Sequence, residues 1–210
     1  MTQSLQIHGQ HFILHPTGSL FWEEQEMLLI SDVHLGKVTH FRKFGAAVPS
    51  TLIHKNFELL DLVMTYFRPN HLCFLGDLFH SHINSEWQFF ENWITKYNSK
   101  KTLVTGNHDI ISPLKYEALR VEVKAKLDLE KFILTHEPQT MSGFFNISGH
   151  IHPAVRLKGK GRQVLKLPCF FKSKEQLILP AFGKFTGTHV LPVASDNEIF
   201  ACTRTEVLKI

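Results

Sequence analysis

Short, continuous runs of apolar residues punctuate the first part of the chain, and such runs predict strands that are buried on both faces. They occupy residues 27–30, 72–75, 102–105 and 132–135. Between the first three runs lie two stretches with apolar residues three or four positions apart, as on one face of a helix. These stripes run through Ile53, Phe57, Leu60 and Met64, and through Trp87, Phe90, Trp93, Ile94 and Tyr97. Strands that alternate with helices predict an α/β fold.

Both ends of the chain also show strand patterns, and those near the N-terminus alternate apolar and polar residues. Near the N-terminus the segments are residues 5–8, 11–15 and 19–22, with a turn at Gly9-Gln10. In the last third they are residues 164–171, 176–181 and 198–203. We therefore expect a second sheet packed against the first, as in an α/β sandwich. No repeat or flexible linker divides the 210 residues, so we expect a single domain over residues 1–210.

Composition narrows the class of protein. Hydrophobic residues make up 43% and charged residues 20%, as in ordinary soluble globular proteins. Cys73, Cys169 and Cys202 lie far apart in apolar runs, so we expect three buried thiols and a reducing, cytoplasmic setting. Residues 1–10 lack the apolar core of a signal peptide, and no run is long enough to span a bilayer. We expect no membrane association.

The net charge and the histidine content are compatible with a polyanionic substrate and with metal binding, but they do not identify the residues involved. The formal net charge is +4, which is compatible with a polyanionic substrate but does not require one. Fourteen histidines are many for this length, and histidine is the commonest metal ligand. Their positions must decide which of them bind metal.

Each predicted central strand leads into polar residues that can bind a metal ion. The residues that follow the strands are Asp32 and His34, Asp77, Asn107 to Asp109, His136, and His150 and His152. In open α/β sheets, ligands bind beyond the carboxyl ends of the strands, so these side chains should converge. Carboxylate, amide oxygen and neutral imidazole together suit Mn²⁺, Fe²⁺ or Zn²⁺.

Spacing supports the same interpretation. Asp32-x-His34 and His150-x-His152 would each place two side chains on one face of an extended segment. A glycine precedes Asp77, Asn107 and His150 directly, where it would let the backbone turn beside the site.

The ordered motifs resemble those of the calcineurin-like metallophosphoesterase superfamily. The motifs are Ser31-Asp32-x-His34, Gly76-Asp77, Gly106-Asn107-His108-Asp109, His136 and Gly149-His150-x-His152. The resemblance implies a double-sheet α/β sandwich with two divalent metal ions, Mn²⁺ first among them. It also implies that Asp32, His34, Asp77 and His152 hold one ion. Asp77 would bridge to the second ion, which Asn107, His136 and His150 complete.

The resemblance also implies a hydrolase that acts on phosphoesters. A hydroxide activated by the two metals would attack phosphorus, and His108 would protonate the leaving group as general acid. A neighbouring side chain should orient the imidazole of His108. His80 and Asp109 are the two candidates for this role.

One departure separates the chain from phosphatases of the superfamily. Those enzymes carry a second Asp three residues after the bridging one, where this chain has His80. The strings around Asp32 and Asp77 look more like nucleases of the superfamily. The segments 45–49 and 179–187 resemble the ligase-associated DNA-damage-response endonuclease (PdeM-like) family. That resemblance implies a DNA endonuclease of DNA repair, with a ligase or helicase among its partners.

Several alternatives stay open at this point. Lys37, Arg42 and Lys43 follow the first motif, where they could contact substrate phosphates or form only a solvated basic turn. The substrate could also be a nucleotide, a cyclic nucleotide or the pyrophosphate of a lipid precursor. A scaffold that has lost its metal is a further alternative, but no ligand position is missing.

Overall fold

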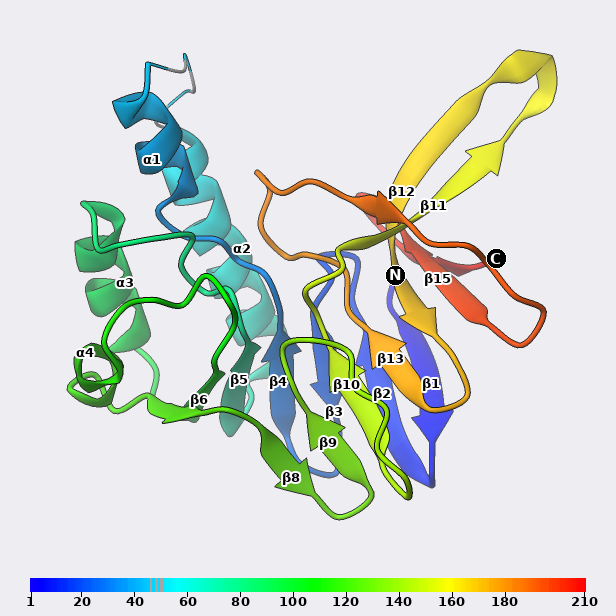
Figure 1. The fold of residues 1–210 in the computed structure, drawn as a ribbon, viewed down its shortest axis with the longest axis horizontal. Helices are drawn as coiled ribbons and strands as arrows, with labels where there is room; N and C mark the ends of the chain where they lie inside the picture. Colours follow the sequence, from blue (N-terminus) through cyan, green and yellow to red (C-terminus); the bar gives the residue numbers. More distant parts are fainter. Residues whose placement is uncertain (46, 48, 50) are drawn as a thin grey trace.

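The computed structural model describes residues 1–45, 47, 49 and 51–210, so Ala46, Val48 and Ser50 lie outside the described residues. Part of the segment 45–49 that resembles the nuclease family therefore lies outside them as well. Two β-sheets pack face to face, and the helices lie together along one of them (Figure 1). This arrangement is the predicted double-sheet α/β sandwich.

The first sheet contains seven strands that follow one another in sequence order. The strands are β1 (Gln3–Ile7), β2 (Gln10–Leu14), β3 (Leu20–Trp22), β4 (Met27–Ile30), β5 (His71–Leu75), β6 (Lys100–Val104) and β7 (Glu122–Lys124). Strands β1 to β4 pair antiparallel, whereas β4 to β7 pair parallel. Three parallel strands, β4, β5 and β6, therefore end at the same edge of the sheet.

The second sheet has the order β14-β11-β12-β13-β10-β9-β8, and β15 and β16 extend it from β12. Its strands are β8 (Leu127–Leu129), β9 (Phe132–Leu134), β10 (Phe145–Ser148), β11 (Pro153–Lys158), β12 (Val164–Lys172), β13 (Gln176–Ile178), β14 (His189–Val190), β15 (Glu198–Cys202) and β16 (Val207–Lys209). Strands β9, β10 and β13 pair parallel. Their carboxyl ends form the second edge on which a site can be built.

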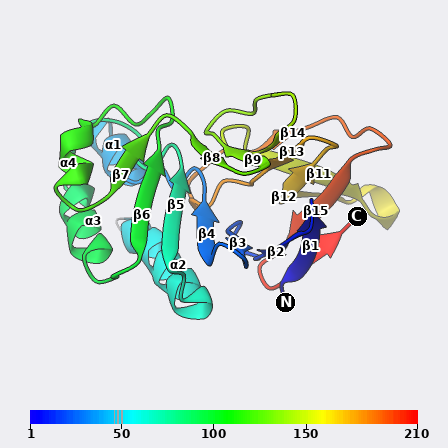
Figure 2. The ribbon, with the colours of Figure 1, turned by 90° about the horizontal axis from the view of Figure 1, so that it is seen from below.

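Helices cover the face of the first sheet that is turned away from the second sheet, around β4 to β7 (Figure 2). They are α1 (Lys37–Lys43), α2 (Thr51–Phe67), α3 (Glu86–Ile94) and α4 (Pro113–Glu117). No helix among the described residues is both long and apolar enough to cross a bilayer.

Two hydrophobic cores hold these three layers together. Within β4, Met27 and Leu29 face the core between the sheets, whereas Leu28 and Ile30 face the core under the helices. This alternation is the reason for the continuous apolar run in the sequence, because both faces of the strand are buried. Phe74 and Phe90 are fully buried in the helix-side core.

Most predicted elements are confirmed, with shifts of a residue or two at their ends. The first stripe lies on α2 and the second on α3, which ends before Tyr97. The first hairpin turns at His8 and Gly9, one residue earlier than predicted, and both have positive φ, 49° and 81°. Positive φ at both central residues matches the right-handed twist of a two-residue hairpin. The three cysteines are buried and free, as predicted.

Of the two alternatives for the residues after the first motif, a solvated basic turn does not describe them, because residues 37–43 form helix α1. The helix carries one buried residue, Val38, so it has no apolar stripe by which the sequence could reveal it. Strands β7, β8, β11, β14 and β16 were not predicted either. Four of them contain only two or three residues, and β11 alternates between half-buried and exposed positions over its outer part, so none forms a long or fully buried apolar run.

Candidate metal centre

The predicted ligands come together at the shared carboxyl edge of the two sheets. Asp32 and His34 follow β4, Asp77 follows β5, and Asn107 follows β6. From the second sheet, His136 follows β9, and His150 and His152 follow β10. The ligand atoms of the aspartates and histidines form two groups, and within each group they lie within 4.8 Å of one another.

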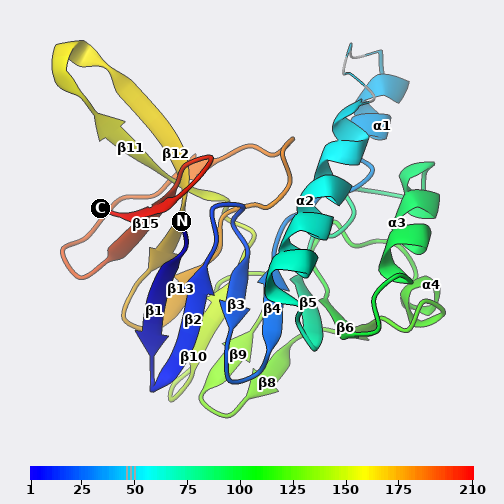
Figure 3. The same ribbon diagram turned by 180° about the vertical axis from the view of Figure 1, so that it is seen from behind.

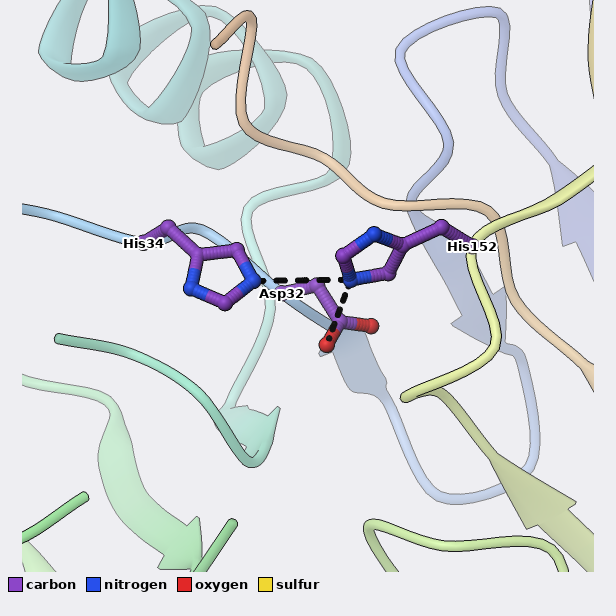
Figure 4. Close-up of side chains that lie close together, drawn as sticks. All are labelled: Asp32, His34 and His152. Carbon is purple, nitrogen blue, oxygen red and sulfur yellow. Dashed lines mark hydrogen bonds and ion pairs between the residues drawn. The ribbon is translucent and has the colours of Figure 1, made fainter. Parts of the chain in front are cut away.

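The first group consists of Asp32, His34 and His152 (Figure 4). The Nε2 atoms of the two imidazoles lie 3.4 Å apart, and Asp32 Oδ1 lies 3.2 Å from His152 Nε2. Asp32 is fully buried, and His34 is buried as well. Three potential ligand atoms thus converge from two different sheets.

The second group gathers around the Nε2 atom of His136. Asn107 Oδ1 and His150 Nδ1 both lie 3.1 Å from it, and Asp77 Oδ1 lies 3.4 Å away. The amide oxygen of Asn107 therefore lies beside the His and Asp side chains of the second group, where it could serve as a further ligand.

Asp77 lies between the groups, and its two carboxylate oxygens point toward different ones. Oδ1 faces His136 in the second group, whereas Oδ2 lies 3.8 Å from His34 Nε2 in the first. The carboxylate is 4% exposed, so these neighbours rather than water surround it. This position is the one that a bridging ligand requires.

Hydrogen bonds to backbone carbonyls set the tautomers of two histidines. His136 Nδ1 donates to Leu75 O at 2.9 Å, and His152 Nδ1 donates to Gly187 O at 3.1 Å. Each bond leaves the lone pair of Nε2 directed into its group, as metal-binding histidines require.

The atoms present fit a pair of cations. Asp32 Oδ1 is buried without a hydrogen-bond donor among the described residues, and the facing Nε2 atoms of His34 and His152 cannot both donate. A cation placed among these three atoms would satisfy all of them. Ligands about 2.1 Å from one ion lie roughly 3 Å apart at right angles, close to the spacings observed here.

Burial sets the charge state of the first group. It lowers the pKa of His34 to about 3, more than the nearby charge of Asp32 raises it, so the imidazole is neutral at neutral pH. Burial also raises the pKa of Asp32, but His152 and the Ser31 hydroxyl together hold that pKa below its ordinary value. A neutral imidazole and an ionised carboxylate are the forms that bind a metal ion.

The backbone at the centre is strained. Asp32, His34, Asp77, His150 and His152 all have positive φ, between 49° and 68°. Left-handed backbone is uncommon for non-glycine residues, and such conformations cost of order 1–3 kcal/mol each. The expectation that Asp-x-His and His-x-His are extended is therefore wrong. The tight backbone sends His150 and His152 into different groups, although the centre contains both.

Two glycines are required by close packing against the ligands. A Cβ atom at Gly76 would lie 2.2 Å from His136 Nδ1, and φ at this residue is 79°. A Cβ atom at Gly149 would lie 1.6 Å from the Ser31 hydroxyl. These positions exclude every side chain, so the backbones of the two sheets can meet at the centre.

His108 lies beside Asp77, and its backbone N–H donates to Asp77 Oδ1 at 2.9 Å. Its Nδ1 lies 3.1 Å from the backbone carbonyl of His80 and donates to it. The His80 ring stacks on the His108 ring, with centroids 5.0 Å apart, and makes no such bond. His80 thus meets His108 through its carbonyl and its ring face, rather than through a ring nitrogen.

Asp109, the second candidate partner of His108, contacts backbone amides instead. Its Oδ1 accepts from Phe79 N at 3.2 Å and its Oδ2 accepts from Gly106 N at 2.9 Å. Burial raises the pKa of Asp109 to about 6. These bonds tie the loop after β5 to the loop after β6, so Asp109 braces the segments that carry Asp77 and Asn107.

The three cations after the first motif occupy helix α1. Lys37 is half-buried, and its backbone N–H donates to the carbonyl of His34 at 3.3 Å. Burial lowers the pKa of Lys37, and the charge of Asp77 raises it. Arg42 and Lys43 are exposed at the far end of the helix. Lys37 is therefore placed next to the centre, whereas Arg42 and Lys43 lie farther along the surface.

Sequence reasoning missed the backbone contacts of residues 182–187. Phe182 N donates to Ser31 O at 3.0 Å and Gly183 N donates to Asp32 O at 3.1 Å, so this segment holds the loop of Asp32. The carbonyl of Gly187 orients His152. Backbone groups leave no motif of their own, and the string 179–187 was singled out only for its family resemblance.

Comparison with known proteins agrees with this geometry. Residues 27–178 match the family described as calcineurin-like phosphoesterase. The structure is similar to that of Pseudomonas putida nuclease MPE, with a TM-score of 0.83 and 27% sequence identity over 100% of both chains. It is also similar to Yfce, a phosphoesterase from E. coli, with a TM-score of 0.45 and 15% identity, over 88% of this chain and 97% of that chain. No curated protein matches the sequence.

Proposed function

Because the chain belongs to the family of calcineurin-like phosphoesterases, we propose that it is a metal-dependent phosphodiesterase that cleaves a nucleic-acid backbone, DNA in particular. The observation that carries the proposal is the pair of ligand groups on either side of Asp77. Similarity to a nuclease over the full length of both chains supports a nucleic-acid substrate. It also supports one catalytic domain over residues 1–210. A role in repair and ligase or helicase partners stay predictions.

We propose that the ions are Mn²⁺, with Fe²⁺ and Zn²⁺ as alternatives. The centre offers carboxylate, amide and imidazole ligands, and the cysteines are buried elsewhere in the fold. When bound, two such ions would clamp a phosphate and lower the pKa of a water molecule between them. Asp32, His34 and His152 would hold one ion, and Asn107, His136 and His150 the other, with Asp77 shared.

His108 is the proposed general acid, which protonates the departing oxygen of the scissile ester. Its Nδ1 is committed to the His80 carbonyl, so Nε2 is the nitrogen that would exchange a proton with the substrate. The hydrogen bond from the backbone N–H of His108 to Asp77 Oδ1 keeps the imidazole next to the shared carboxylate. His80 and Asp109 are then positioning residues. His80 orients the imidazole of His108 through its backbone carbonyl, and Asp109 holds together the two loops after β5 and β6. Lys37 would contact a substrate phosphate, and Arg42 and Lys43 would extend that contact.

Replacing His108 by alanine should slow cleavage of an alkyl phosphodiester by about a hundredfold or more, the usual range for general-acid catalysis. A nitrophenyl phosphodiester should be affected far less, because its leaving group departs without a proton. Steady-state rates on both substrates, with metal content measured in parallel, test this. Equal losses on both substrates would show that His108 does not donate the proton.

A substrate panel tests the proposed function itself. With Mn²⁺, the protein should hydrolyse bis-p-nitrophenyl phosphate faster than p-nitrophenyl phosphate, and it should nick plasmid DNA. Cyclic nucleotides and a pyrophosphate-linked lipid precursor serve as competing substrates. Faster turnover of the monoester with intact plasmid would overturn the nuclease proposal in favour of a small-molecule phosphatase.

A further inference from the structure

The outer part of the hairpin formed by β11 and β12, two strands of the second sheet, projects beyond the rest of that sheet. Figure 1 and Figure 3 show it rising from the same edge as α1, with the loops of the metal centre between the two. Its first strand begins at Pro153, directly after the candidate ligand His152. The arm is therefore anchored at the centre and extends outward from it.

Positive charge concentrates on this arm. Residues 153–167 hold five of the 23 Lys and Arg and none of the 19 Asp and Glu, so the rest of the chain has a formal charge of −1. All five cations are exposed: Arg156, Lys158, Lys160, Arg162 and Lys166. The net charge of +4 thus originates in one projecting hairpin rather than in a generally basic surface.

The register of the hairpin places like charges side by side. Arg156 pairs with Lys166 across the strands, and Lys158 follows Arg156 on the same face. Like charges directly opposite each other destabilise a strand pair. Nothing in the hairpin itself accounts for this arrangement, but an anionic partner beside the face would offset the repulsion.

These cations lack acidic partners within the fold. Among the residues that the structure describes, no carboxylate lies within ion-pair distance of Arg156, Lys158, Lys160 or Arg162. Lys166 Nζ donates to the carbonyl of Thr188 at 2.7 Å, next to Gly187, which orients His152. The charged face therefore begins beside the centre.

The opposite face of the hairpin serves the fold. Leu157 pairs with Leu165, and Leu165 and Leu167 line a cavity of about 420 Å³ together with Pro168 and Pro180. The two faces thus differ in chemistry, one apolar and one cationic. The cationic face is the one that suits a polyanionic partner.

We propose that the β11–β12 hairpin is a nucleic-acid-binding arm, whose cations contact backbone phosphates outside the scissile position. The proposal rests on the proposed function, because an arm of this charge next to a phosphodiesterase centre fits the polyanion that contains the scissile bond. Several phosphate contacts would position the strand without reading its sequence. They would also make binding strongly dependent on salt.

Salt-dependent binding tests the arm. The variant carries Arg156→Gln, Lys158→Gln, Lys160→Gln and Arg162→Gln. Fluorescence anisotropy would follow its binding to nuclease-resistant phosphorothioate DNA in Mn²⁺. Each lost phosphate contact lowers the slope of log Kd against log salt by about 0.7–0.9, so the slope should fall by about 3–4 when all four contacts are lost. Affinity at low salt should fall at least about tenfold.

A matched control removes the same number of charges at the opposite edge of the sheets. Arg68, Lys96, Lys131 and Lys174 are exposed and lie just before the amino ends of β5, β6, β9 and β13. Replacing these four residues by glutamine should leave the slope close to that of the unaltered protein. An equal fall in both variants would show that net charge, not the arm, governs binding.

Hydrolysis of bis-p-nitrophenyl phosphate separates this inference from the proposed function. The arm variant should hydrolyse this small substrate as fast as the unaltered protein, because the metal centre is intact. If the arm variant hydrolyses the small substrate normally and binds DNA as tightly as the unaltered protein, only the proposal for the arm is overturned. If the unaltered protein does not hydrolyse the small substrate, the proposed function is overturned. Loss of binding to phosphatidylserine vesicles, with DNA binding unchanged, would assign the arm to a membrane surface instead.

Discussion

Replacement of Asp77 by alanine is expected to strip both ions from the protein and to lower phosphodiesterase activity by well over a hundredfold. Its two oxygens face different ligand groups, at 3.4 Å from His136 Nε2 and 3.8 Å from His34 Nε2. Without the shared carboxylate, two divalent cations would lie close together with one less anion to separate them. Loss of a residue that hydrogen-bonds to a metal ligand lowers metal affinity or activity by about 10–100-fold in such sites. Loss of a ligand itself should therefore lower them more.

Elemental analysis and activity should be measured on the same preparation. Replacing Asp128, an exposed carboxylate on β8, by alanine is the control and should retain both ions. Circular dichroism would confirm that both variants fold. Two ions per chain in the Asp77 variant would remove this residue from the bridging position.

Removal of the metal is expected to abolish activity and to lower the melting temperature, and Mn²⁺ should restore both. Ions that bind the folded protein at a hundred times their Kd stabilise it by about 2.7 kcal/mol. For a chain of this size, that corresponds to a fall of roughly 5–10 °C on chelation. The fall in melting temperature originates in the first group. Without an ion, Asp32 Oδ1 has no hydrogen-bond donor among the described residues, and two imidazole nitrogens face each other.

Exhaustive dialysis against a chelator, followed by calorimetry and by addition of one metal at a time, measures these effects. The His108→Ala variant is a useful companion, because it should keep the thermal response to Mn²⁺ while losing most of its activity on alkyl phosphodiesters. Activity and melting temperature that both survive dialysis would exclude the two-metal centre.

The sequence could single out the candidate ligands because each follows a run of apolar residues that is easy to detect. Residues 27–30 have apolar side chains on both faces, so the strand and the position of Asp32 after it could be predicted together. Helix α1 escaped prediction because Val38 is its only buried residue. The first strand of the arm escaped as well, because its cations face solvent rather than a core.

The conformations of the ligands were beyond prediction from spacing. A period of two assigns residues i and i+2 to one face only when the backbone is extended, and His150 and His152 have φ of 68° and 52°. The partners of His108 illustrate the same limit. The sequence offered the side chains of His80 and Asp109, but the Nδ1 contact is a backbone carbonyl, which every residue carries.

The late segment that holds the loop of Asp32 has a consequence for the order of events during synthesis. A growing chain that has been extended to His152 already contains every candidate ligand. It still lacks Phe182 and Gly183, whose amides bind the carbonyls of Ser31 and Asp32, and Gly187, which orients His152. Strand β13, which flanks β10 in the second sheet, is also made after the last ligand. Domains fold as units when their chains are complete, so a ribosome-bound fragment would carry the ligands without an assembled centre. A phosphoesterase built this way would gain its assembled centre only after residues 182–187 have been synthesised.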